Sequence, residues 1–328
     1  MNFFYYNPIG KAVDRMIYFI CSVIIYIIPA SFFRMMRPLW IRQGKHYATN
    51  ITERVDYYCR FSKCTLPTDN STLIRNYKFP FRKKKKLSTY FFDLYKEIIY
   101  FNKNFRFFYE FGDITTEPSV PSIVKSRPIT NGRFSNSVIM KLNRKRHFKF
   151  IHDSKSFREK KDMIISRNYV CQPHRILFLR KYFGHPMCNV GQINGDVIDG
   201  HTEWIKEFIP IKEQLNYKFI CCIEGNDVAT NLKWVMSSNS LPVMPKPTYE
   251  SWFMEGTLIP DYHYVAIKPD YSDLIERMQF YIEHPEKAET IIRNNHEYIK
   301  QFKNKSKEKL ISLLVLQKYF LNTEQVKH

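Results

Sequence analysis

Residues 219–244 read FICCIEGNDVATNLKWVMSSNSLPVM, and they decide the fold because their order is strand, glycine turn, helix and second buried strand. The first five residues form a short apolar run of the kind that is buried in a parallel sheet. Gly225 permits a sharp exit from that strand, and Asn226 or Asp227 can cap a helix that extends to about Ser237. The segment therefore predicts part of an α/β fold.

The start of that predicted helix is a candidate phosphate site, because its open N–H groups and the helix dipole both attract anions. A nucleotide diphosphate is the expected ligand at the turn that begins with Glu224, with Thr230 and Lys233 on the following helix face. The spacing matches neither GxGxxG nor a Walker loop, so an ordinary strand–helix corner is the alternative. Lys233 stands two helical turns beyond Gly225, and its side chain would have to fold back to reach a phosphate.

Strands and helices alternate on both sides of this segment, which predicts parallel sheets with helices on both faces. The expected helices cover residues 90–102, 173–182, 202–215 and several stretches after Tyr271, with Pro285 between them and one further helix capped near Ser154 or Ser156. The expected strands cover residues 105–111, 148–152, 188–193 and 263–267. We divide the chain into two lobes near residue 165.

Charge is very unevenly placed along the chain. The 328 residues have a net charge of +20, and residues 1–150 contain 27 basic and 9 acidic side chains, so +18 of the excess lies in that half. Such an excess indicates an anionic partner: nucleic acid, an acidic membrane surface or a phosphorylated glycolipid. Residues 82–86, RKKKK, are the densest run, and a solvated loop is the alternative for that run alone. No nucleic-acid-binding motif is present, and the aromatic residues lie mostly in apolar runs, which disfavours nucleic acid.

The seven cysteines predict a reduced, cytoplasmic protein. Their number is odd, several lie inside apolar runs, and none forms a CxxC pair. The spacing of the cysteines fits no zinc-binding motif, and we expect no metal ligands.

One apolar segment raises the question of a membrane. Residues 16–33, MIYFICSVIIYIIPASFF, carry no charge and have Arg15 before them and Arg34 after them. The length is marginal for a span of roughly 20 residues, and Pro29 disturbs its last turn. A buried helix, a helix lying in the membrane interface and an N-terminal anchor are the three alternatives. A cleavable signal peptide fits less well, since no small-x-small cleavage site follows.

Four segments of the chain together resemble glycosyltransferase family 90, whose bacterial branch is the more similar one. They are FGDITTEPSVPSIVKSRPI (111–129), FGHPMCNVGQIN (183–194), CIEGNDVATNLKWVMSSNSLPVMPKP (222–247) and YESWFMEGTLIPDYHYVAI (249–267). The resemblance implies a GT-B architecture with two Rossmann-like domains, residues 1–165 and 166–300, and a helical tail at 301–328 that crosses back. It also implies a UDP-sugar donor, inversion at the transferred sugar and no obligatory metal.

The same resemblance implies that Asp113 is the catalytic base. This residue follows the aromatic run FRFFYEF and a glycine, which places it at the carboxyl end of a predicted strand, where open α/β sheets hold ligands. An aspartate that caps the turn at Thr115 is the alternative. Glu110 and Glu117 are the neighbouring carboxylates that would replace Asp113 as base.

Cations must stabilise the charge that builds on the departing diphosphate. The eukaryotic branch of the family has an arginine close to Asn231, and this chain lacks it. Lys125 and Arg127 in IVKSRPI are the first candidates for the clamp. Lys155 and Arg158, which we place in the first lobe, are the second pair, and solvated loop charge is the alternative for both pairs.

Acidic residues after the second buried strand are candidates for binding the ribose of the donor. Glu255 lies in WFME, the recurrent part of this segment in the family, and is favoured over Glu250. His185 and His263 are catalytic possibilities, but a single histidine beside apolar residues is more often structural.

The sequence thus predicts an inverting transferase for a UDP-hexose, either glucose or galactose, acting on the core saccharide of lipopolysaccharide at the inner face of a bacterial membrane. The basic half would face the phosphorylated acceptor. A transferase acting on a capsule or protein acceptor and a non-catalytic protein that binds membrane or RNA are the alternatives.

Overall fold

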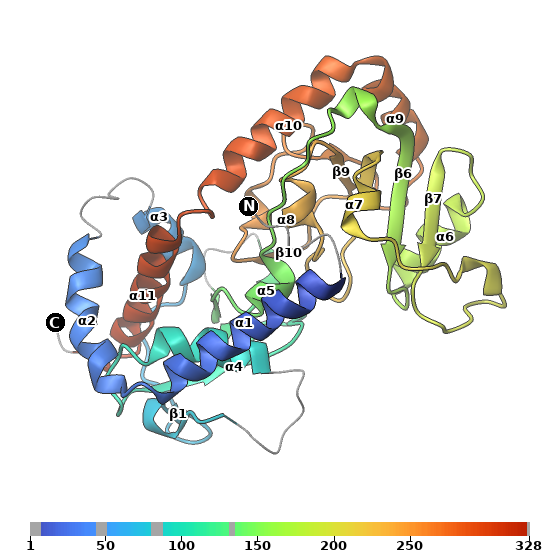
Figure 1. Ribbon diagram of the computed structural model, residues 1–328. Coiled ribbons are helices and arrows are strands. Elements are labelled where there is room, and N and C mark those ends of the chain that lie inside the picture. The colour runs from blue at the N-terminus through green and yellow to red at the C-terminus, as the bar shows by residue number, and fades with distance from the viewer. Residues whose placement is uncertain (1–7, 44–50, 80–87, 131–134, 327–328) are drawn as a thin grey trace. The chain divides into compact units, whose positions relative to one another are not determined.

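The computed structural model describes residues 8–43, 51–79, 88–130 and 135–326 (Figure 1). The basic run at residues 82–86 lies outside these ranges. The chain forms two compact units. The five-stranded unit comprises residues 1–14, 147–247 and 256–301, and the four-stranded unit comprises residues 15–146, 248–255 and 302–328.

The five-stranded unit contains one parallel sheet. Its strands in spatial order are β11 (Val265–Ala266), β9 (Leu241–Met244), β8 (Tyr217–Cys221), β6 (Lys161–Asn168) and β7 (Cys188–Gln192). The chain starts at the inner strand β6, adds β7 on one side, and then adds the other three strands on the opposite side. The predicted α/β class with parallel strands is confirmed. The GT-B arrangement of two domains stays a prediction.

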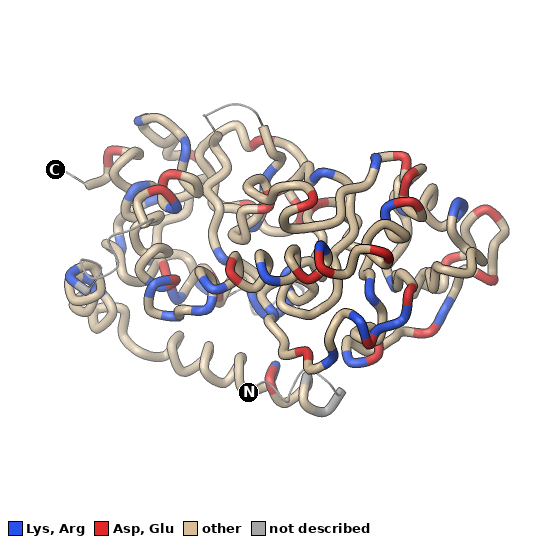
Figure 2. The backbone as a smooth tube through the Cα atoms, turned by 90° about the horizontal axis from the view of Figure 1, so that it is seen from above, with Lys and Arg blue, Asp and Glu red and all other residues tan. Residues whose placement is uncertain are grey.

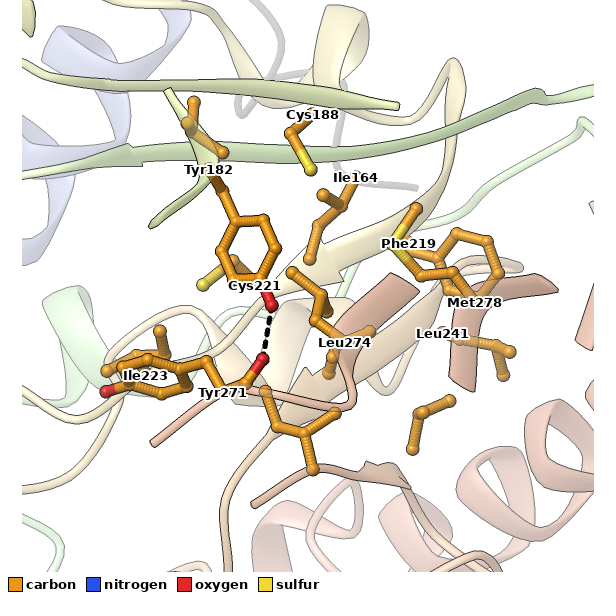
Figure 3. Close-up of a cluster of buried hydrophobic side chains, with 14 of the residues drawn as sticks. Ile164, Tyr182, Cys188, Phe219, Cys221, Ile223, Leu241, Tyr271, Leu274 and Met278 are labelled. Carbon is orange, nitrogen blue, oxygen red and sulfur yellow. Dashed lines mark hydrogen bonds between the residues drawn. The ribbon is translucent and has the colours of Figure 1, made fainter. Parts of the chain in front are cut away.

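Helices and short turns connect these strands. The helices are α6 (Pro173–Tyr182), α7 (Ile211–Gln214), α8 (Leu232–Val235), α9 (Leu274–Glu283) and α10 (Pro285–Lys300), with single 3-10 turns at Phe157–Glu159, Thr202–Trp204 and Glu255–Thr257. The core forms where α9 packs on the sheet: Leu274 and Met278 meet Phe219 and Leu241, all fully buried (Figure 3). Burying such side chains stabilises a fold by about 1.5–3 kcal/mol each.

Three predicted elements of this unit are wrong. The helix expected from 226 or 227 to 237 is a loop up to Asn231 followed by the single-turn α8. Val228 and Ala229 are buried in that loop, so its apolar side chains reach the core without a helix. Residues 202–215 form two short turns and no continuous helix, since Pro210 interrupts them.

The expected strand at 148–152 is irregular, and the amide of Ile151 donates to Ser237 Oγ at 2.9 Å instead of to a neighbouring strand. The inner strand β6 was missed in the sequence, because KDMIISRN has only three apolar residues between polar ends. β6 also spans residue 165, so the expected boundary between lobes differs from the division into compact units.

The four-stranded unit contains a mixed sheet, a two-stranded sheet and several helices. The mixed sheet has β1 (Thr72–Leu73) antiparallel to β2 (Arg106–Tyr109), which continues in parallel with β3 (Ser122–Val124) and β5 (Ser137–Ile139). The helices are α1 (Pro8–Ile27), α2 (Ala30–Gln43), α3 (Ile51–Tyr58), α4 (Ser88–Ile98), α5 (Arg144–His147) and α11 (Lys305–Asn322), with a 3-10 turn at Ile74–Asn76. α1 begins within the residues of the five-stranded unit, and α5 ends there.

A buried ion pair fixes the two-stranded sheet of β4 (Ser126–Pro128) and β10 (Tyr249–Ser251). Arg127 Nε donates to Glu250 Oε1 at 2.7 Å, and both side chains are buried. The guanidinium also donates to the carbonyls of Ser137 and Tyr57, at 3.0 and 2.7 Å. Burial lowers the pKa of Arg127, and the opposing charge of Glu250 acts against that shift.

A second buried charge cluster fixes the last helix. Glu308 on α11 accepts from Arg54 at 2.7 Å and from the indole of Trp252 at 2.7 Å. Trp252 stacks on Tyr58 with 4.0 Å between ring centroids. Two distant segments, 248–255 and 302–328, therefore complete the four-stranded unit.

The apolar segment at 16–33 forms parts of two helices. In the described part of the chain no single helix is both long and apolar enough to cross a membrane, whereas Ala12–Ile27 and Ala30–Arg42 meet that test only together, with a bend of 101° between them. The break falls at Pro29, as its missing N–H and fixed φ require. Tyr18, Ser22 and Phe33 are buried, but most of the large apolar side chains are exposed, which disfavours the first of the three alternatives, a buried helix.

The Arg127–Glu250 pair predicts a large loss of stability when one partner is removed. Arg127→Ala leaves Glu250 charged and buried, and we expect the free energy of unfolding to fall by about 3–5 kcal/mol. Lys318→Ala removes an exposed pair with Asp56 in the same unit and should change it by less than about 1 kcal/mol. Urea unfolding followed by fluorescence measures both, and equal effects would contradict the assignment of Arg127 as an anchor.

Candidate functional site

The carboxyl edge of β6 and β8 is the place where the five-stranded sheet changes direction. β6 and β8 are neighbours, but the chain visits β7 between them, so the loops after β6 and β8 leave the sheet toward opposite sides. Open α/β sheets bind ligands at such a switch point. The sequence-predicted turn at 224–227 follows β8 and lies at this edge.

The loop after β8 is held by its own backbone and by Asn231. The amide of Gly225 donates to the carbonyl of Asp227 at 3.0 Å. The Asn231 side chain donates to the carbonyl of Cys221 at 2.8 Å, and closes the loop back on the strand end. Asn226 is exposed, whereas Asp227 is buried. The amides of this turn belong to a tight loop, and the expected helix N-terminus is absent there.

Three side chains from the start of α6 contact this turn. Arg175 donates to the carbonyls of Glu224 and Ile223 at 2.8 and 2.9 Å. His174 donates from Nε2 to the same Glu224 carbonyl at 2.8 Å, and Gln172 donates to Asn226 Oδ1 at 2.9 Å. The first turn of α6 and the turn after β8 therefore form one polar surface with a fixed guanidinium.

Sequence reasoning missed this contribution of α6. The helix itself was predicted with its observed bounds, but its position at the switch point follows only once β6 is recognised as the strand before it. Gly225 shows how close the two elements lie: a Cβ there would stand 3.3 Å from Arg175 Nη2. A side chain at this position would therefore press on the guanidinium, which would have to move by a few tenths of an ångström.

The two other residues predicted in this region, Thr230 and Lys233, lie differently. Thr230 is half-buried in the loop, and Lys233 is fully buried inside α8. Because α8 begins only at Leu232, Lys233 stands in its first turn and not two turns into a helix.

The second cationic pair, Lys155 and Arg158, belongs to the five-stranded unit. The sequence predicts it in the first lobe. The exposed Lys155 donates from Nζ to Asn216 Oδ1 at 2.6 Å. Arg158 forms an exposed ion pair with Glu289 on α10 at 2.8 Å. Both cations thus have protein partners at the surface, and a role at the donor stays a prediction.

Asp113 lies at the carboxyl edge of the four-stranded sheet, as predicted. It follows β2, and Lys125 follows the neighbouring parallel strand β3, so the two side chains meet at the same edge. Lys125 Nζ lies 2.6 Å from Asp113 Oδ1. The lysine side chain is 2% exposed and the aspartate 35% exposed, so a buried cation fixes a carboxylate that solvent reaches. Gly112, with a φ of 117°, makes the turn that presents Asp113.

The neighbouring carboxylates have different surroundings. Glu117 accepts from the amide of Ser137 at 2.9 Å and from the hydroxyl of Ser135 at 2.8 Å, which ties its loop to β5. Glu110 is exposed at the end of β2. Of the three carboxylates, Asp113 is thus the one that combines solvent access with a buried cationic partner.

The remaining acidic candidates are occupied within the four-stranded unit. Glu250 pairs with Arg127, whose guanidinium is buried and was expected at the diphosphate. Glu255 is 2% exposed and accepts from the hydroxyl of Ser251 at 2.9 Å and from its amide at 2.6 Å. These bonds close the turn at Met254, which has a φ of 57°. A ribose-binding role for Glu255 and a phosphate role for Arg127 stay predictions.

His263 has a structural environment. Its Nδ1 accepts from the amide of Ile259 at 2.9 Å, and its ring packs against Tyr298 at 5.0 Å. Burial lowers the pKa of His263 to about 4, so the ring is neutral at neutral pH. His185 accepts from the amide of Met187 at 3.2 Å, which places it in a local turn.

Among the described residues, no group of three or more His, Cys, Asp or Glu side chains is arranged to hold a metal ion. All seven cysteines are free thiols.

Comparison with known proteins gives two matches. The sequence pattern of glycosyl transferase family 90 matches residues 191–319. The chain is also 43% identical, over 271 residues, to the O-glucosyltransferase LpsA of Dichelobacter nodosus, and the alignment covers 82% of each protein. The matched pattern includes the turn after β8 and extends into α11.

The contacts of Arg175 predict that it orders the turn after β8. In Arg175→Ala the carbonyls of Glu224 and Ile223 lose a charged donor, and hydrogen exchange of amides in residues 222–231 should accelerate at least about tenfold. Arg180→Ala is the matched control, because Arg180 lies on the same helix and pairs with exposed Asp199. Mass spectrometry of exchanged peptides measures both variants. Unchanged exchange at 222–231 in Arg175→Ala would refute the ordering role.

Proposed function

Because the chain belongs to glycosyltransferase family 90, we propose that it transfers glucose from UDP-glucose to the core saccharide of a bacterial lipopolysaccharide. Family membership makes the protein a glycosyltransferase. The donor, the acceptor and the stereochemistry are the proposal. Glucose is preferred to galactose because the relative from Dichelobacter nodosus is an O-glucosyltransferase.

The switch-point edge of the five-stranded sheet supports the donor half of the proposal. The diphosphate of the donor would lie at the turn of Glu224 and Gly225 and near the first turn of α6, which is the positive end of the dipole of that helix. Arg175 brings a positive charge to the same place, held by two carbonyls. A fixed cation and the positive end of a helix dipole can stabilise the charge that develops on departing UDP.

The ion pair of Asp113 and Lys125 supports the acceptor half, and it is the observation that carries the mechanism. A hydroxyl of the acceptor would donate its proton to Asp113 while its oxygen attacks the anomeric carbon and UDP departs. The buried Lys125 ammonium holds the carboxylate in one orientation at 2.6 Å. One displacement assisted by one base inverts the configuration of the transferred sugar.

Charge and the named relative support a lipopolysaccharide acceptor. The excess of +18 in residues 1–150 matches an acceptor with phosphate groups. We also propose that the protein acts at the inner face of the cytoplasmic membrane, where its basic half would meet anionic headgroups. We also propose that transfer needs no divalent metal, as the family resemblance implies, and activity in the presence of EDTA tests this.

An acceptor on a protein or a capsule is the second candidate within the same family. The two candidates differ in the acceptor that the enzyme modifies. A lipopolysaccharide transferase should act on truncated core saccharide and should leave polypeptides unmodified. A non-catalytic membrane- or RNA-binding protein, the third alternative from the sequence, is disfavoured by the family membership.

Asp113→Asn provides the test. The amide keeps the size of the side chain but cannot accept the proton, so kcat for transfer from UDP-glucose to truncated lipopolysaccharide should fall by about 10²–10⁴. Binding of UDP, measured by calorimetry, should stay within about twofold, because the donor half lies in the other unit. Mass spectrometry of the acceptor reports the added hexose.

Glu110→Gln is the matched control, because Glu110 is an exposed carboxylate of the same segment. It should retain transfer. Full activity in Asp113→Asn, or loss of activity in Glu110→Gln alone, would contradict the assignment of the base. No transfer from any UDP-sugar would contradict the proposed donor.

A further inference from the structure

α1 exposes an apolar stripe along one face. Six large apolar side chains are each between 45% and 74% exposed: Met16, Ile17, Ile20, Val23, Ile24 and Ile27. Their spacing of one, three and four residues places all six within one side of the helix. Such a face is far from the usual surface of a folded domain, where exposed apolar residues are scattered singly.

α2 continues this exposed apolar surface after the bend. Phe32, Met35 and Leu39 are 49%, 67% and 48% exposed, and they recur at intervals of three and four residues. Of the fifteen large apolar side chains that are exposed among the described residues, nine belong to these two helices. We call these nine residues the α1–α2 apolar face.

The opposite sides of both helices are packed on their own unit. Tyr18 donates to Asp93 Oδ1 on α4 at 3.0 Å, and Tyr26 packs on Tyr95 with 4.8 Å between ring centroids. On α2, Phe33 meets Tyr100 at 5.4 Å, and Arg37 lies over the ring of Phe101 at 4.5 Å. These contacts orient the helices, so the apolar face points away from the rest of the four-stranded unit.

The packing also decides how the face can meet a bilayer. A helix that crosses a membrane needs apolar surroundings on every side, whereas α1 has Asp93 and a tyrosine hydroxyl against its inner side. The bend of 101° after α1 further prevents the two helices from continuing as one span. An orientation in the plane of the membrane, with one face immersed, satisfies both constraints.

Arginines lie at each end of the apolar face and within its α2 part. Arg15 precedes it and is exposed, Arg34 lies within its α2 part between Phe32 and Met35 and is half-buried, and Arg42 follows it and is exposed. Between residues 16 and 33 there is no charged residue, and Figure 2 shows this uncharged stretch of backbone between the basic positions. Residues 8–43 contain five basic residues and one acidic residue, Asp14. Arginine side chains reach from an immersed helix to lipid phosphates.

We propose that the α1–α2 apolar face docks on the surface of an anionic phospholipid bilayer. The nine apolar side chains enter the headgroup boundary, and Arg15, Arg34 and Arg42 contact lipid phosphates. The proposal builds on the proposed function, since a lipid-linked acceptor would then be presented at the surface that the enzyme occupies. A second copy of the chain is a poorer occupant, because its own arginines would meet those of the first.

Vesicle flotation tests the docking surface with the full-length protein. The protein should float with vesicles of phosphatidylglycerol and phosphatidylethanolamine and bind much less to vesicles of phosphatidylcholine alone. In the double variant Ile20→Glu/Ile24→Glu, two carboxylates enter the apolar face, and binding to the anionic vesicles should fall at least about tenfold.

Val197→Glu/Phe208→Glu is the matched control, because these two side chains are also exposed and apolar but lie in the five-stranded unit. It should float like the unmodified protein. Replacing Arg15, Arg34 and Arg42 with glutamine should reduce binding to anionic vesicles by about fivefold per charge, and should leave the weak binding to neutral vesicles unchanged.

Three results would overturn the docking surface. The first is that the Ile20→Glu/Ile24→Glu variant floats as well as the unmodified protein, and the second is that the control variant loses binding to the same extent. The third is that the unmodified protein binds no vesicles but forms a dimer, seen by light scattering, that the Ile20→Glu/Ile24→Glu substitutions dissociate. Transfer of glucose to delipidated core saccharide separates this proposal from the proposed function. The Ile20→Glu/Ile24→Glu variant should keep that activity, whereas a protein that floats but transfers no sugar would contradict the function and leave the surface in place.

Discussion

The buried ion pair of Arg127 and Glu250 is the interaction on which the rest of the four-stranded unit depends. It joins β4 to β10, a strand that lies more than 120 residues away in the sequence. Since Lys125 stands between β3 and β4, the pair also holds the backbone that carries the lysine toward Asp113. Two buried charges are costly to desolvate, and here they are retained where a unique strand pairing must be specified.

A fixed cation lies next to each of the two groups that we propose for sugar transfer. In one unit a buried lysine orients an accessible aspartate, and in the other a half-buried arginine orders the turn at the sheet edge. The proposed base and the proposed donor turn thus each have one fixed cation as a neighbour, and each lies at the carboxyl edge of parallel strands. A transferase needs these two functions, a base for the acceptor and positive charge for the departing diphosphate.

The sequence was sufficient to predict features with strong local signals. The strand β8, the helix α6 and the position of Asp113 after an aromatic strand followed from periodicity and a glycine turn. The features that the sequence did not predict depend on tertiary contacts. β6 has too few apolar residues to be recognised alone. The loop after β8 buries Val228 and Ala229 without forming the helix that its sequence predicts. The partner of Arg127 could not be identified, since nothing local connects it with Glu250.

The anomeric configuration of the transferred sugar tests the central claim most directly. With Asp113 as the single base and one displacement at the anomeric carbon, UDP-α-glucose should give a β-linked glucose on the acceptor. Nuclear magnetic resonance of the purified product distinguishes the two anomers. A β-linked product would agree with Asp113 as a single base, and an α-linked product would contradict it.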